Sequence, residues 1–73
     1  MGRLRTLSGK AVCAILAEHG FGAVRQRGSH AIMQKPIPGS TITVPVPLHD
    51  ELKVGTLSTI IRQSGLPRSL FEM

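Results

Sequence analysis

Apolar residues recur at helical spacing near the two ends of the chain. The first helical face follows the i, i+3, i+4, i+7 pattern and consists of Val12, Ile15, Leu16 and His19. Ser8 is suited to the N-cap, and Gly20 to the position just past the last turn. We therefore expect a helix between them, with His19 in a structural role in its last turn. The preceding arm, Met1–Thr6, has no such period and is expected to be frayed.

The second helical segment lies near the end of the chain. Its expected buried stripe consists of Leu57, Ile60 and Ile61. Gly55 or Thr56 is expected to cap this helix, and Gly65 to close it. Pro67 suits the first turn of a short terminal helix. Two apolar side chains of that helix are expected to pack on the core, Leu70 and Phe71.

Between the helical segments the sequence predicts extended structure. Three strands are expected: Phe21–Arg27, His30–Lys35 and Thr41–Val46. Gly28 and Ser29 can form a two-residue hairpin turn, whereas the turn-rich segment Pro36–Ser40 is expected to be a loop. Pro45 places the third strand near a sheet edge or at a strand end.

The order helix, three strands, helix predicts an α+β fold. We expect a two-layer αβββα domain in which two helices cover one face of a three-stranded antiparallel sheet. The other face is then open to solvent. With 73 residues, the chain is expected to form a single domain, residues 1–73, with a surface groove rather than a deep cavity.

One conflict concerns the second strand. If that strand is regular, His30 and Ile32 share a face, yet Ile32 ought to be buried and a functional His30 ought to be exposed. Either the strand begins with a bulge near the hairpin tip, or Met33 is the inward residue. The sequence leaves both solutions open.

Composition narrows the class of partner. The formal charge of +5 and the pI of about 10.8 favour a polyanionic or acidic partner. Phe21 and Phe71 are the only aromatic residues, so a base-stacking platform is not expected. The single cysteine, Cys13, is expected to be a small buried hydrophobe and fits a reducing compartment. Since no apolar run is long enough to span a membrane and no signal-peptide pattern is seen, we expect a cytoplasmic protein without membrane association.

The residues around the first hairpin turn suggest chemistry on a phosphodiester. A metal-free ribonuclease needs a group that removes the 2′-hydroxyl proton and positive charge where the phosphorane charge develops. His30 can meet the first need, because imidazole exchanges protons near neutral pH. The side chains expected to contact RNA are Arg25, Gln26, Arg27 and Lys35. The backbone N–H groups of Gly28 and Ser29 could add hydrogen-bond donors.

A metal site or cofactor is not expected. The three histidines, His19, His30 and His49, fall in separate predicted elements, and the acidic residues are few and scattered. The role of His49 is open between a second acid–base group, a substrate contact and a cap-like partner for the following helix.

The chain resembles the HicA (YcfA-like) toxin family along nearly its whole length. Matching blocks appear in the family's order: Leu7–Lys10, His19–Phe21, Val24–His30, Val46–His49 and Leu52–Leu66. The resemblance implies a double-stranded-RNA-binding-like fold and a type II toxin that cleaves mRNA without a required metal. It also implies that His30 of Gly-Ser-His is catalytic and that a HicB-like antitoxin covers the active surface. Two other classes stay open, a non-catalytic RNA-binding module of the same fold and a basic protein that docks an acidic partner.

Overall fold

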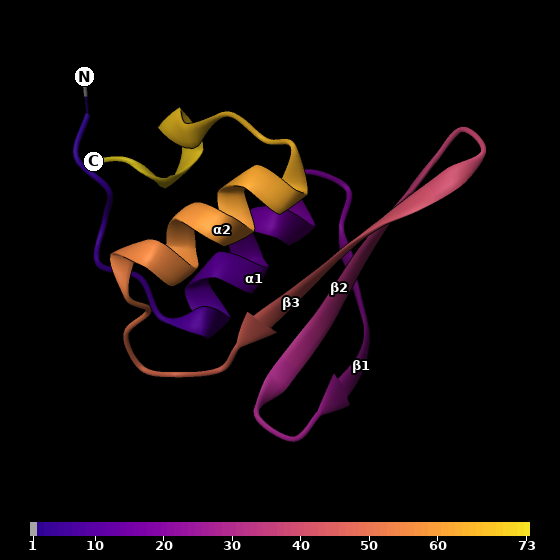
Figure 1. Ribbon diagram of the computed structural model, residues 1–73, viewed down its shortest axis with the longest axis horizontal. Helices are drawn as coiled ribbons and strands as arrows, with labels where there is room; N and C mark the ends of the chain where they lie inside the picture. Colours follow the sequence, from indigo (N-terminus) through magenta and orange to yellow (C-terminus); the bar gives the residue numbers. More distant parts are fainter. Residues whose placement is uncertain (1) are drawn as a thin grey trace.

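The computed structural model describes residues 2–73 and contains two α-helices, three strands and a terminal 3₁₀ helix (Figure 1). In chain order they are α1 (Gly9–Glu18), β1 (Gly22–Arg27), β2 (His30–Ile37), β3 (Ser40–Pro47), α2 (Val54–Ser64) and η1 (Arg68–Phe71). The strands form an antiparallel sheet in the order β1-β2-β3. The predicted α+β class and αβββα order are confirmed.

The ends of α1 follow local sequence signals. The side chain of Ser8 accepts a hydrogen bond from the backbone N–H of Ala11 at 3.0 Å, so it is the predicted N-cap. His19 is the C-cap, and its Nδ1 lies 3.0 Å from the carbonyl oxygen of Ile15, which it reaches as a donor. Both helices end in glycines with positive φ, Gly20 (95°) and Gly65 (71°). The predicted helix ends and the structural role of His19 are therefore confirmed.

The inner face of the sheet packs on the helices. β2 and β3 pair without interruption, so Met33 lies opposite Val44 and both point to the same side. These two residues and Val46 belong to the hydrophobic core. Met33 is thus the inward residue, which resolves the conflict left by the sequence, and Ile32 lies on the outer face with His30.

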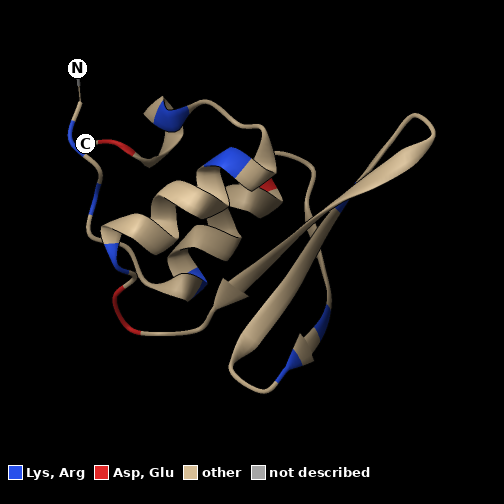
Figure 2. Cartoon of the chain, viewed as in Figure 1, with Lys and Arg blue, Asp and Glu red and all other residues tan. Residues whose placement is uncertain are grey.

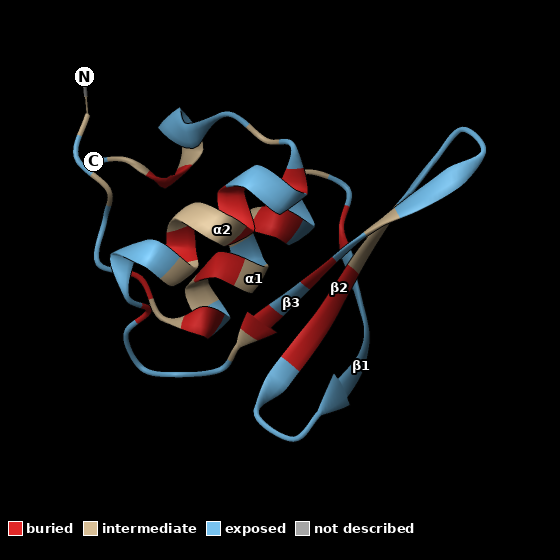
Figure 3. Ribbon diagram, in the orientation of Figure 1, coloured by how far each residue is buried: buried red, intermediate tan, exposed pale blue. Residues whose placement is uncertain are grey.

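Both helices contribute to this core. α1 contacts all three strands, and α2 contacts β3. The helices, the segment before α1 and the C-terminal tail supply most of the remaining core residues: Leu7, Val12, Leu16, Leu57, Ile60, Ile61 and Phe71. The predicted stripe of α2 and the packing of the tail are confirmed. Figure 3 shows that burial ends where the strands extend past the helices and along β1.

The predicted start of α2 is wrong. The helix begins at Val54, with Lys53 as an N-cap that makes no side-chain hydrogen bond, so neither Gly55 nor Thr56 caps it. The first turn is closed by the backbone alone, since the N–H of Leu57 donates to the carbonyl of Lys53 at 2.9 Å. A start without a capping side chain leaves no local signal in the sequence.

The segment Pro36–Ser40 is not a loop, contrary to expectation. Only Pro38 and Gly39 form the turn, and the flanking residues pair as parts of β2 and β3. Pro36 is tolerated because β1 does not pair with this part of β2, which leaves that edge free. Pro45 lies on β3, an edge strand as predicted. The β2–β3 hairpin consequently projects beyond the helices (Figure 1).

The N-terminal arm is held by the C-terminal segment, so the expectation of a frayed arm is wrong for residues 2–6. The contacts are a β-bridge between Leu4 and Glu72, a 2.9 Å bond from the N–H of Arg5 to Phe71 O, and one of 2.9 Å from the N–H of Met73 to Arg3 O. This pairing joins the two ends of the chain, which no local pattern reveals. Met1 lies outside the described residues.

Candidate functional site

The tip of the β1–β2 hairpin is a two-residue turn held on both sides. Gly28 has a φ of 57°, whereas Ser29 has no positive φ, as in type II′ hairpin turns. The side-chain amide of Gln26 donates to the carbonyl of Gly28 at 3.0 Å. The backbone N–H of Leu48 donates to the carbonyl of Ser29 at 2.6 Å. These bonds fix the backbone on which His30 follows.

The two-residue turn and a β-bulge in β1 together set which β1 side chains share a face with His30. The register passes from Ala23↔Met33 to Arg25↔Ile32 and then to Arg27↔His30. Val24 is the extra residue, and it exchanges the faces of all later β1 residues. Because opposed residues of an antiparallel pair point to the same side, Arg25 and Arg27 join His30 on the outer face. The two-residue turn sets the pairing of Arg27 with His30, and the bulge lets Ala23 face the inner side at the other end of β1.

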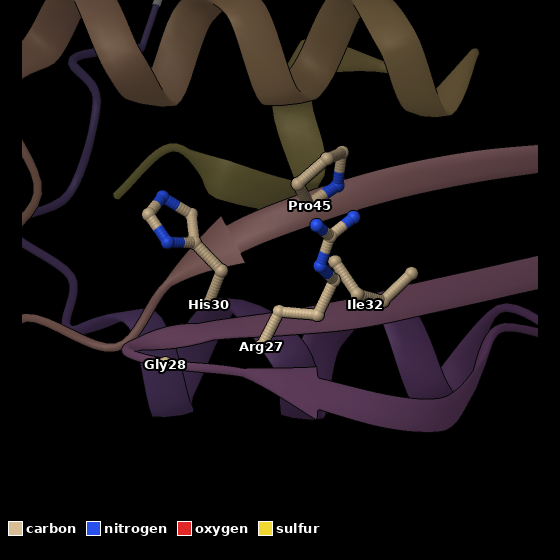
Figure 4. A pocket seen from close by; sticks show the side chains of 5 residues that line it. All are labelled: Arg27, Gly28, His30, Ile32 and Pro45. Carbon is tan, nitrogen blue, oxygen red and sulfur yellow. The ribbon is translucent and has the colours of Figure 1, made fainter.

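A hollow of about 530 Å³ opens on the outer face beside the turn. We call it the hairpin hollow; its lining consists of Arg27, Gly28, His30, Ile32 and Pro45. In Figure 4 the Arg27 side chain reaches past Ile32 toward Pro45, and the His30 imidazole stands on the other side of Pro45. His30 is exposed at the start of β2. The hollow therefore combines an imidazole, a guanidinium and turn backbone.

A second hollow of about 290 Å³ lies between the outer face and α2. We call it the helix hollow; it is lined by His30, Pro45 and Pro47 of the sheet and by Thr56, Thr59, Ile60 and Gln63 of α2. His30 and Pro45 belong to both hollows, so the two form one groove that runs from the hairpin tip to α2. Sequence reasoning missed the α2 residues. The available signal was the spacing of Thr56, Thr59 and Gln63 beside the buried stripe.

Two predicted RNA contacts lie away from this groove. Gln26 pairs with Ala31, on the inner side of the sheet, and its amide is engaged by the turn. Lys35 also projects to the inner side, and its ammonium lies 5.9 Å from the ring centroid of Phe21, within range of a cation–π interaction. The structure therefore brings Arg25 and Arg27, but not Lys35 or Gln26, to the face of His30.

His49 is exposed in the connection between β3 and α2. Its carbonyl accepts a 2.9 Å hydrogen bond from the N–H of Gly9 at the start of α1. The imidazole lines neither hollow. The structure therefore does not bring His49 together with His30.

The other titratable and nucleophilic side chains form no second candidate site within residues 2–73. Residues 2–73 contain no group of three or more His, Cys, Asp or Glu side chains that could hold a metal ion. Cys13 is half-buried rather than buried, and burial raises the pKa of its thiol, which disfavours the nucleophilic thiolate. Neither α1 nor α2 has the length and apolar character needed to cross a bilayer. Figure 2 places basic positions on β1 close to the hairpin tip.

Comparison with known proteins identifies the family of the chain. The family model described as the HicA toxin of bacterial toxin–antitoxin matches residues 9–66 of the 73-residue chain. The matched span runs from α1 through α2 and includes every residue that lines the two hollows. A search of curated proteins gives no match. Because the match extends over far more than half of its length, the chain belongs to the HicA toxin family of bacterial toxin–antitoxin systems.

Proposed function

We propose that this toxin is an endoribonuclease that cleaves mRNA without a metal ion, with His30 as the catalytic acid–base residue. One observation carries the proposal: Arg27 and His30 pair across a fixed turn, and both line an open hollow on one face of the sheet. RNA cleavage requires a proton acceptor and positive charge at the reacting phosphate. Membership of the HicA toxin family supports the same function.

The proposed chemistry uses the 2′-hydroxyl of the substrate as the nucleophile. His30 accepts its proton while O2′ attacks the adjacent phosphorus. The bond from phosphorus to O5′ breaks, and the leaving oxygen takes up a proton from water, while the proton on His30 returns to solvent. The products are a 2′,3′-cyclic phosphate and a 5′-hydroxyl end. Arg27 stabilises the negative charge that develops on the phosphorane, and the turn N–H groups of Gly28 and Ser29 supply further donors.

The RNA backbone and the antitoxin would bind the same outer face of the sheet. Arg25 and Arg27 are both exposed on β1, and Arg25 would bind the phosphate next to the one that Arg27 contacts. We propose that a HicB-like antitoxin covers the groove in the inactive complex. Because the proposed substrate is mRNA, we propose that the toxin acts in the cytoplasm.

Expression without a partner is the first test of this function. We expect growth arrest and loss of bulk mRNA, because an uncovered ribonuclease acts on every accessible transcript. Growth is followed after induction, and mRNA integrity is followed by sequencing of RNA ends. Normal growth with intact mRNA, at confirmed soluble expression, would contradict the proposal. In that case, RNA binding without cleavage would instead support a non-catalytic RNA-binding module.

A second prediction concerns the two arginines on the outer face. Replacing Arg25 and Arg27 by Ala should weaken RNA binding and reduce the slope of log affinity against log salt by about 0.7 for each phosphate that the variant no longer neutralises. The matched control replaces Arg3 and Arg5, two exposed arginines of the N-terminal arm, and changes the net charge equally. Affinity for a single-stranded RNA is measured across a salt titration. Equal slopes for the two double variants would show that β1 is not the RNA surface.

A further inference from the structure

We propose that the helix hollow holds the base of the nucleotide next to the cleaved phosphate, and that Gln63 reads that base. This inference rests on the proposed function, since it assigns a specificity residue to the same reaction. It concerns α2, whose groove-facing side chains have no part in the chemistry described above. The observations that carry it are the lining of the two hollows and the free amide of Gln63.

The two hollows differ in chemistry as the two parts of a nucleotide do, the charged phosphate and the neutral base. The hairpin hollow contains the guanidinium of Arg27, which suits a phosphate. The helix hollow contains no acidic or basic side chain besides His30. Its apolar residues are Pro45, Pro47 and Ile60, and its polar ones are Thr56, Thr59 and Gln63. Apolar surface with neutral hydrogen-bonding groups suits the face and edge of a base that has left its stack.

His30 fixes the order of the two parts along the RNA. It lines both hollows, so a phosphate held beside Arg27 and a base held beside α2 would both lie against the same imidazole. Consecutive parts of one RNA strand meet this requirement. The base in the helix hollow is therefore adjacent to the bond that His30 acts on.

Gln63 is the side chain of this hollow best suited to read a base. The hydroxyl of Thr59 already donates to the carbonyl of Gly55 at 3.1 Å, which leaves it mainly an acceptor. Within residues 2–73, no hydrogen bond engages the amide of Gln63, and the residue is exposed. An amide offers a donor and an acceptor side by side, a pattern that matches adenine most often. We therefore expect a preference for adenine at one position beside the cut.

The test is the cleavage profile of a randomised RNA pool. For Gln63→Ala, the preference at one position beside the cut should fall by about fivefold or more, the lower end of the discrimination that one bidentate base contact provides. Ser58→Ala is the matched control, because Ser58 lies on the same helix but lines neither hollow. Loss of a preference for whichever base the parent favours supports the proposal. An unchanged profile in Gln63→Ala overturns it.

A binding measurement keeps the proposal testable apart from catalysis. The parent is titrated with short DNA oligonucleotides, which have no 2′-hydroxyl and cannot be cleaved through one, and the side-chain amide signals of Gln63 and Gln34 are followed by NMR. Gln34 is the internal reference, because its amide is held by Thr43 and it lines neither hollow. A base-dependent shift of the Gln63 signal supports the inference, and a shift no larger than that of Gln34 contradicts it.

The two measurements separate this inference from the proposed function. If the parent cuts RNA and the profile of Gln63→Ala matches the parental one, the inference alone fails. If the parent does not cut RNA, the proposed function fails, and the NMR titration still decides whether Gln63 contacts a base.

Discussion

Replacing His30 by Ala is expected to lower the rate of RNA cleavage by a factor of about 100 or more, the usual scale for general acid–base catalysis. The substitution removes the proposed proton acceptor but little of the core, because the imidazole is exposed at the start of β2. The backbone pairing of His30 with Arg27 and Pro47 does not depend on its side chain. The variant should therefore stay folded and still bind the antitoxin.

The control for this experiment is a second histidine. His49→Ala also removes an exposed imidazole, but one that lines neither hollow, and should cleave at close to the parent rate. Cleavage is measured on a defined RNA, with thermal unfolding and antitoxin binding measured on the same preparations. A folded His30→Ala variant that cleaves at the parent rate would show that the assignment is wrong, and His49 would then be the candidate.

The nature of the products tests the same chemistry from the substrate side. Cleavage through the 2′-hydroxyl should yield 2′,3′-cyclic phosphate ends, and RNA with deoxyribose at the cut site should resist. Activity should survive EDTA, because in the proposed mechanism His30 and Arg27 supply the proton transfer and the positive charge without a metal. Loss of activity in EDTA that is restored by a divalent cation would contradict the proposed mechanism.

The parts of the fold that the sequence predicts are those set by local signals. Ser8 and Gly20 mark the two ends of α1, and each lies within a few residues of the helix end that it caps. The stripe of α2 follows from the helical period alone. The short links between the strands predict the antiparallel sheet, and the family resemblance singles out His30. These signals need no knowledge of which segments meet in space.

The features that the sequence does not predict depend on distant pairing. The bulge at Val24 is defined only by the register against β2, and it lets Ala23 face inward opposite Met33 while Arg25 and Arg27 face outward with His30. The alternation of β2 puts Lys35 on the opposite face, a result that needs Met33 to be identified as inward. The contribution of α2 to the groove needs the packing of α2 beside β3. Sequence reasoning therefore finds the catalytic candidate and the side of the groove formed by Arg27 and Gly28, but not the side formed by α2.

The substitution Gly9→Ala is expected to destabilise the protein by about 2–4 kcal/mol, although helix propensity alone would favour it. A β-carbon at Gly9 would lie 1.9 Å from the carbonyl oxygen of Pro47 and 2.9 Å from the Cα of Leu48. Both obstacles are backbone atoms, which cannot rotate away as a flexible side chain can. The start of α1 would have to move off the end of β3, and the 2.9 Å bond from the N–H of Gly9 to His49 O would break.

The matched control for this prediction is Gly55→Ala, in the first turn of α2. A β-carbon there meets no atom within 4 Å, and Gly55 has no positive φ, so alanine should be neutral or stabilise the fold by up to about 1 kcal/mol. Denaturant unfolding gives both changes in free energy, and thermal unfolding should show a shift of about 4–8 °C for each kcal/mol. Because Leu48 also holds the turn at Ser29, folded Gly9→Ala protein should cleave RNA more slowly than Gly55→Ala protein. Equal stability of the two variants would show that the approach of α1 to β3 does not constrain residue 9.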